Sequence, residues 1–197
     1  MRSFYRCVVV LVFALAFGCG GAPGTGVKAG GSAALAQDQA TTQDQATAAA
    51  VALMDKMTGQ WLVTGTIHNE ATTHDVDVDW VLKRQYIRIH EVSPDKSAED
   101  GIGYEAWIYL VWDAKQGEYA VLWLDSTAAT NFAPEGIGHA KPDGDRIPIV
   151  IKDTDGSAIH TTFAYDRAKD SWSWAIDNVG TSGETSPFAR MTLTRKK

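Results

Sequence analysis

Two apolar segments separated by a short polar loop constrain the fold of this chain more than any other feature. Tyr104–Trp112 and Tyr119–Leu124 flank the loop Asp113–Glu118. Both segments are rich in aromatic and β-branched residues and are too short for an ordinary helix, so they predict a β-hairpin. If Asp113 faces Glu118, the remaining pairs are Trp112 with Tyr119, Leu110 with Val121, Ile108 with Trp123, Tyr109 with Leu122 and Trp107 with Leu124. Both faces of the hairpin are apolar, which predicts a central position in the sheet.

Short alternating segments on either side of this hairpin predict further strands. In residues 73–82, Asp75, Asp77 and Asp79 alternate with apolar residues, as in a strand with one buried face. The other expected strands are 61–67, 86–92, 146–152, 158–165, 171–177 and 188–195, with a weaker strand or loop at 133–141. Nine or ten short strands joined by turn residues predict an all-β antiparallel sandwich or barrel. A short helix over about 50–57 is expected to precede them.

Several local motifs resemble those of known β-barrel proteins. A short helix followed by Gly59-Gln60-Trp61 and an up-and-down meander is similar to the lipocalin or calycin type of barrel. Trp80–Tyr86, Val111–Tyr119 and Trp123–Ser126 resemble a bacterial family numbered 1579 among domains of unknown function, which is thought to be lipocalin-like. The resemblance covers about residues 50–195, although that family commonly has Gly-Arg where Lys83-Arg84 stands here. It implies an up-and-down lipocalin-like β-barrel with a short N-terminal helix, and no particular activity.

The N-terminal residues are typical of an exported protein. Residues 1–18 contain Arg2 and Arg6 and then an apolar run too short to span a bilayer, which predicts a signal peptide. Ala16-Phe17-Gly18-Cys19 resembles a lipobox, which implies acylation of Cys19, a lipid anchor in the cell envelope and, in a Gram-negative source, the outer membrane. The alternative is ordinary cleavage before Gln37 and a secreted or periplasmic protein. Residues 19–48 are expected to form a disordered tether and residues 49–197 the barrel domain. Alanine and glutamine are good helix formers, so Gln37 to Ala50 could form a fraying helix at the end of this tether.

The charge of the chain argues against two classes of partner. The formal net charge is −6, and removal of the first 18 residues leaves 16 basic against 24 acidic residues, a net charge of −8. A chain that binds nucleic acid is expected to carry a basic face, and adhesion to anionic lipid also needs basic residues. We therefore expect no nucleic-acid partner, and contact with the membrane through the lipid anchor alone.

The polar residues provide no established catalytic or metal-binding motif. Asp75-x-Asp77-x-Asp79 resembles the start of a calcium loop, but Trp80 stands where that loop needs glycine. None of the five histidines has the spacing of a zinc site, although His68 and His74 could face each other across a hairpin. His90 and Glu91 are adjacent in a predicted strand and therefore point to opposite faces. We expect no catalytic residue, no metal and no cofactor.

The aromatic residues are the best indication of a binding site. Seven tryptophans either fill the barrel or line a pocket for one small apolar or aromatic ligand. Trp107 and Tyr109 share one face of the hairpin and Trp123 is expected on the other, so one of the two groups should line the pocket. Tyr86, Arg88 and His90 share a face of the third strand; if it points inward, Arg88 or His90 would orient the ligand, and otherwise these residues are solvated.

We therefore predict non-catalytic binding of a small ligand inside the barrel. The first alternative is an envelope interaction module that uses the barrel exterior, for which a filled barrel beside an exposed apolar patch would be evidence. The second is an enzyme at the barrel mouth, which would need His90 or Glu105 inside an open pocket next to another titratable group.

Overall fold

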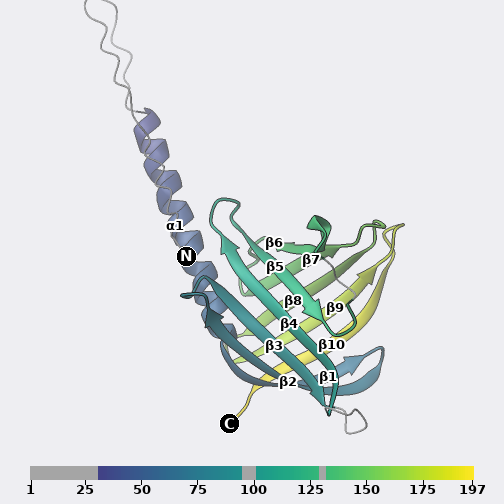
Figure 1. Cartoon of the computed structure of the whole chain (residues 1–197). Helices are drawn as coiled ribbons and strands as arrows, with labels where there is room; N and C mark the ends of the chain where they lie inside the picture. The colour runs from purple at the N-terminus through teal and green to yellow at the C-terminus, as the bar shows by residue number, and fades with distance from the viewer. Residues whose placement is uncertain (1–30, 95–100, 129–131) are drawn as a thin grey trace, which may run out of the picture.

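The chain folds into a closed barrel of ten antiparallel strands preceded by one helix (Figure 1). The computed structural model describes residues 31–94, 101–128 and 132–197. Each strand pairs with its neighbours in sequence, and β1 closes the barrel by pairing with β10. The elements are α1 (Gly31–Met57), β1 (Gly59–Ile67), β2 (Glu70–Val81), β3 (Tyr86–Pro94), β4 (Ile102–Asp113), β5 (Glu118–Asp125), the 3-10 turn η1 (Pro134–Gly136), β6 (Ile137–Ala140), β7 (Arg146–Lys152), β8 (Ala158–Asp166), β9 (Ser171–Val179) and β10 (Thr185–Arg195).

The barrel confirms the fold class that the strand pattern predicted. The hairpin of β4 and β5 also has the expected register, with Asp113 opposite Glu118 and Ile108 opposite Trp123. Asp75 and Asp77 are exposed while Val76 and Val78 are buried, so the alternation in β2 separates solvent from core as expected.

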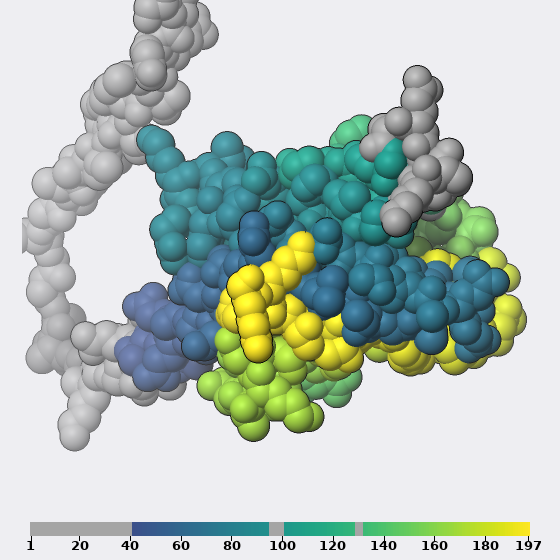
Figure 2. Space-filling model, turned by 90° about the horizontal axis from the view of Figure 1, so that it is seen from below, coloured from purple at the N-terminus to yellow at the C-terminus, as the bar shows by residue number. Residues whose placement is uncertain are grey.

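The first and last strands meet along a long seam. Trp61 to Ile67 pair with Arg195 to Ala189, and Figure 2 shows the yellow C-terminal strand against the blue N-terminal strands. Gly65 lies in this seam, opposite Met191 of β10. A Cβ atom at this position would be 2.1 Å from the carbonyl oxygen of Arg190. Only glycine fits there, so closure of the barrel depends on a residue without a side chain.

Helix α1 is longer than the sequence indicated. It begins at Gly31, whereas the sequence favoured helix only from about Gln37, within the segment expected to form a tether. The segment is rich in alanine and glutamine, which have high helix propensity, and this favours continuation of the helix away from the barrel. The predicted signal peptide and Cys19 lie outside the described residues. Within the described part of the chain, no helix has the length and apolarity needed to span a bilayer.

The C-terminal turns of α1 close one end of the barrel. Ala50, Leu53, Met54 and Met57 are buried and belong to the same core cluster as the inward-facing strand residues. Three aromatic side chains hold the helix from inside. The indole Nε1 of Trp61 donates to the Met57 carbonyl at 2.7 Å, that of Trp172 to Lys56 at 3.3 Å, and the hydroxyl of Tyr119 to Ala50 at 3.4 Å. The bonds to Lys56 and Met57 satisfy carbonyls of the last turn, which have no partner within the helix, and the bond to Ala50 ties an earlier turn to the barrel wall.

Candidate functional site

A cavity of about 710 Å³ occupies the half of the barrel away from the helix. Its lining residues come from the strand ends opposite α1, and exposed Pro94 and Thr127 mark where it reaches the surface. The apolar wall consists of Ile67, Ile151, Ile159, Ile176, Phe188, Met191, Trp123 and Trp174. A largely apolar concave site of this size is suited to a small organic molecule.

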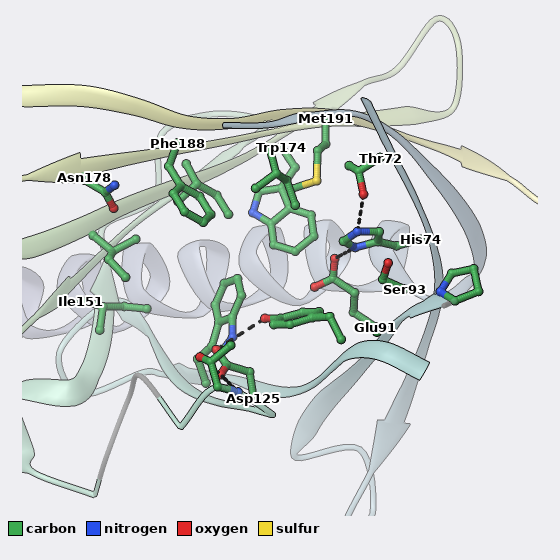
Figure 3. Close-up of a pocket in the computed structure, with 18 residues that line it drawn as sticks. Thr72, His74, Glu91, Ser93, Asp125, Ile151, Trp174, Asn178, Phe188 and Met191 are labelled. Carbon is green, nitrogen blue, oxygen red and sulfur yellow. Dashed lines mark hydrogen bonds and ion pairs between the residues drawn. The ribbon is translucent and has the colours of Figure 1, made fainter. Parts of the chain in front are cut away.

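Tryptophan forms the floor of the cavity. The rings of Trp123 and Trp174 have centroids 5.7 Å apart and are tilted by 43°. Phe163 stacks against Trp174 at 4.7 Å, on the filled side of the barrel, and the Trp174 indole donates to Thr161 at 2.8 Å. These contacts hold Trp174 in one orientation, with Phe188 and Met191 beside it on the same wall (Figure 3).

A hydrogen-bonded chain of three polar residues crosses the opposite part of the wall. Nδ1 of His74 lies 2.5 Å from Oε1 of Glu91, and Nε2 lies 2.6 Å from the hydroxyl of Thr72 (Figure 3). His74 and Glu91 are only 3% and 2% exposed. Because a carboxylate only accepts hydrogen bonds, Nδ1 donates to Glu91, and a neutral ring then accepts the Thr72 hydroxyl at Nε2. Both ring nitrogens of His74 are therefore occupied by protein groups.

Tyr104 and Asp125 complete the polar part of the site. The Tyr104 hydroxyl donates to Oδ2 of Asp125 at 3.4 Å, and the backbone N–H of Thr127 donates to Oδ1 at 2.9 Å. Burial raises the pKa of Tyr104 far above its ordinary value, and the negative charges of Glu91 and Asp125 raise that pKa further. Tyr104 is therefore a neutral phenol in a part of the cavity where Glu91 and Asp125 make the electrostatic potential negative.

Of the six residues that the sequence offered as ligand contacts, only Trp123 lines the cavity. Trp107 and Tyr109 alternate with the buried residues Ala106, Ile108 and Leu110, so they lie on the barrel exterior. The structure thus answers the question that the sequence left open about the hairpin, in favour of the face that carries Trp123.

The structure also decides between the two directions left open for Tyr86, Arg88 and His90. They alternate with the buried residues Ile87 and Ile89, so they too lie outside the barrel. None of them can orient a ligand within the cavity.

On the exterior these residues form a cluster around Trp107. The His90 ring stacks on it at 3.7 Å, and the Arg88 guanidinium lies 5.2 Å from its centroid. Nε2 of His90 is 2.7 Å from Glu105. His90 and Glu105 are therefore outside the pocket, and the barrel-mouth enzyme that would have used them has no support from this arrangement.

His74, Glu91 and Trp174 were not predicted from the sequence as residues of the site. A signal was present, because Glu91 continues the apolar phase of Ile87 and Ile89, and His74 continues that of Val76 and Val78. A charged residue at a buried position of a strand needs a partner. The sequence did not show that the inward-facing residues of β2 and β3 are adjacent at this point. Val76 is opposite Glu91, which brings His74, two residues earlier in β2, within hydrogen-bonding distance of Glu91.

The cavity has no arrangement suited to metal ligation among the described residues, but it does contain a histidine placed for proton transfer. Among the described residues, no group of three histidine, cysteine, aspartate or glutamate side chains is arranged to hold a metal. His68 and His74 do not face each other, since His74 pairs with Val63 and His68 packs against Phe188. The hydroxyl–imidazole–carboxylate order of Thr72, His74 and Glu91 is one in which a histidine can accept a hydroxyl proton.

Comparison with known proteins does not add an activity to this geometry. A scan against models of protein families gave no match to the chain, and a search of curated proteins gave none either, so the resemblance to the family of unknown function 1579 remains a prediction.

Proposed function

We propose that this protein binds a small apolar or aromatic molecule, without chemical conversion, in the cavity of the barrel. The observation that carries the proposal is the division of the interior into two halves. The half next to α1 is filled by Trp61, Trp172, Tyr119 and the buried methionines of the helix, whereas the other half retains about 710 Å³ between aromatic and aliphatic walls. A barrel whose interior served stability alone would be expected to be packed throughout.

A neutral fluorescent probe tests this proposal directly. N-phenyl-1-naphthylamine should become brighter on entering the cavity, and Trp123 and Trp174 should transfer energy to it. Ser93→Trp, which places an indole at the cavity lining, should weaken binding at least about tenfold. Ser173→Trp makes the same change on the exposed face of β9 and is the matched control. Equal binding by both variants would mean that the probe binds elsewhere.

A second candidate function is supported by a different surface. Leu82, Tyr86, Tyr109, Val111, Leu122 and Ile137 line an apolar groove of about 400 Å³ on the outside of β3 to β6. Leu82 is 69% exposed. An exposed apolar surface of this kind is typical of interaction sites, so an envelope interaction module remains the alternative. Leu122→Lys should abolish any complex that forms through this groove. Leu62→Lys, on the outside of β1, is the control and should leave the complex intact. Light scattering after size-exclusion chromatography measures the mass of the complex in each case.

We also propose that the domain is held in the cell envelope by acylation of Cys19. The support is the apolar segment of residues 7–17, which is followed by Gly18-Cys19. Labelling with an alkyne analogue of palmitate should be lost in Cys19→Ser and kept in Cys7→Ser, because Cys7 leaves with the signal peptide. A mature protein without lipid that begins at Gln37 would instead show ordinary secretion.

A further inference from the structure

The polar residues of the cavity indicate which charge its ligand carries. Glu91 and Asp125 are the acidic residues among its lining side chains, and the described lining includes no lysine or arginine. His74 is the only histidine of this lining, and both its ring nitrogens are bound to Glu91 and Thr72. A ligand carboxylate would therefore find no lysine or arginine in the described lining and no free nitrogen on His74, and it would face two acidic groups.

Asp125 is the carboxylate that a ligand can reach. It is half-buried near the point where the cavity opens, whereas Glu91 is fully buried against His74. Its hydrogen-bond partners are the neutral groups of Thr127 and Tyr104. It takes part in no ion pair with the described residues. A carboxylate has about four lone-pair positions, so Asp125 keeps acceptor capacity for a further donor.

The aromatic walls, like Asp125, favour a ligand that carries a positive charge. The negative faces of aromatic rings attract cations, and tryptophan does so most strongly. Tyr104, Trp123, Trp174 and Phe188 all line the cavity, and Asp125 lies below Trp174 in the view of Figure 3. A protonated nitrogen near Asp125 would thus meet both a carboxylate and aromatic rings, while an attached apolar body would contact the isoleucines of the opposite wall.

We propose that the cavity selects amphipathic amines, in which an aromatic or aliphatic body fills the apolar part and a protonated nitrogen pairs with Asp125. This inference rests on the proposed ligand-binding function and narrows it to one class of molecule. It also replaces the expectation that an arginine would receive a ligand carboxylate, because Arg88 lies on the exterior and pairs with Asp79.

Three matched naphthalene compounds test the selection. 2-(1-Naphthyl)ethylamine is a cation at neutral pH, 1-naphthaleneacetate is an anion, and 1-ethylnaphthalene is neutral, and all three carry a naphthyl ring with a two-carbon substituent. Each compound is used to displace N-phenyl-1-naphthylamine from the full-length protein at low ionic strength. The amine should bind at least about tenfold more tightly than the acid, as expected for one charge-assisted contact. Its advantage should decrease when salt is added.

Asp125→Asn assigns the preference to one carboxylate. Asparagine has nearly the same shape and keeps an acceptor for Thr127, so the variant should fold, as circular dichroism would show. Its ratio of amine affinity to acid affinity should fall about tenfold, and its affinity for 1-ethylnaphthalene should be unchanged. Asp77→Asn removes the same charge from the exposed face of β2 and should change neither affinity.

The results distinguish failure of this inference from failure of the proposed function. If the neutral probe binds but the acid competes as well as the amine, or if Asp125→Asn retains the preference, the inference is wrong and the cavity still binds ligands. If no compound binds by displacement or by direct calorimetry, the proposed function fails, and the inference fails with it.

Discussion

At the scale of single residues, the contact between His74 and Glu91 has a counterpart outside the barrel. His90 and Glu105 form a similar pair at 2.7 Å, but they are 27% and 37% exposed, against 3% and 2% for the buried pair. Water can solvate either member of the exterior pair after its partner is removed. Glu91 is almost fully buried at the cavity wall and would be solvated far less, so the two pairs should respond differently to the same substitution.

We therefore predict that His74→Leu lowers the free energy of unfolding by about 3–5 kcal/mol, because it leaves a buried carboxylate without its partner. The double variant His74→Leu/Glu91→Leu should recover much of this loss, since it also removes the group that was left unpaired. His90→Leu, the matched exterior control, should cost about 1 kcal/mol or less. Urea denaturation provides the three values, and a double variant no more stable than His74→Leu would contradict the argument.

Tyr119 predicts how stability depends on pH in the alkaline range. Burial raises its pKa to about 12 in the folded protein, against about 10 in an unfolded chain. Below pH 10 both states keep the proton, so this contribution to stability is complete. Between pH 10 and 12 the unfolded state releases the proton and the folded state retains it, so stability falls as pH rises.

Between pH 10 and 12 the unfolding free energy of Tyr119→Phe should therefore fall less steeply with pH than that of the original protein. The difference in slope should be about 1.4 kcal/mol per pH unit, which corresponds to one proton. Loss of the 3.4 Å hydrogen bond to Ala50 would shift the whole curve without changing its slope. Urea denaturation at several pH values separates the two effects. Parallel curves for the two proteins would show that burial of Tyr119 does not raise its pKa.

Residue alternation predicted more about the strands than about the site. It separated Ile87 and Ile89 from Arg88 and His90 correctly, because successive side chains of a strand point to opposite faces. It could not tell which apolar face of the central hairpin points inward. That choice depends on the curvature of the closed sheet, which brings Trp123 toward Trp174 from a distant part of the chain.

At the scale of elements, the helix is the part that the sequence described least well. Its last turns were expected from the spacing of Ala50, Met54 and Met57, and these residues are buried. Before these turns only a fraying helix from Gln37 was expected, because residues 31–48 have a single large apolar side chain, Leu35, and helix propensity alone is a weak predictor. The hairpin of β4 and β5 was predicted down to its register, because a short loop between two strongly apolar strands leaves few alternatives.

Met54→Ala tests whether the helix closes the barrel as a structural element. The side chain is 1% exposed and belongs to the core, so its truncation should lower the free energy of unfolding by about 2–5 kcal/mol. Lys56→Ala is the control in the same turn. Its side chain is exposed, and its carbonyl, which Trp172 contacts, is unchanged. Similar stability of the two variants in thermal denaturation would mean that the helix is not part of the cooperative unit.

At the scale of the whole molecule, a closed barrel has no free edge, but its seams differ in strength. β8 and β9 pair over nine residues, from Ala158 with Val179 to Asp166 with Ser171. β6 and β7 are joined through a single pair, His139 with Val150. Pro148 lies in β7, the strand next to this weakest seam, and pairs on its other side with Thr162 of β8. Few backbone hydrogen bonds across a seam favour local opening there.

Gly138 allows β6 and β7 to pack despite this sparse pairing. A Cβ atom at Gly138 would lie 2.7 Å from Cγ2 of Ile149 and 2.9 Å from Cγ1 of Ile151. Because Ile151 also lines the cavity, the seam and the ligand-binding site share a wall. Opening of the seam would thus loosen one side of the cavity.

We predict that backbone amides of residues 137–140 exchange with deuterium at least about tenfold faster than those of residues 171–179, because local opening of β6 breaks fewer hydrogen bonds than opening of β9. Gly138→Ala should increase this difference by pushing Ile149 and Ile151 away, and it should weaken binding of N-phenyl-1-naphthylamine through the displaced Ile151. Exchange followed by mass spectrometry measures both segments in one experiment. Equal rates in the two segments would show that the barrel opens only as a whole, and that the seam beside Pro148 is as stable as the rest of the sheet.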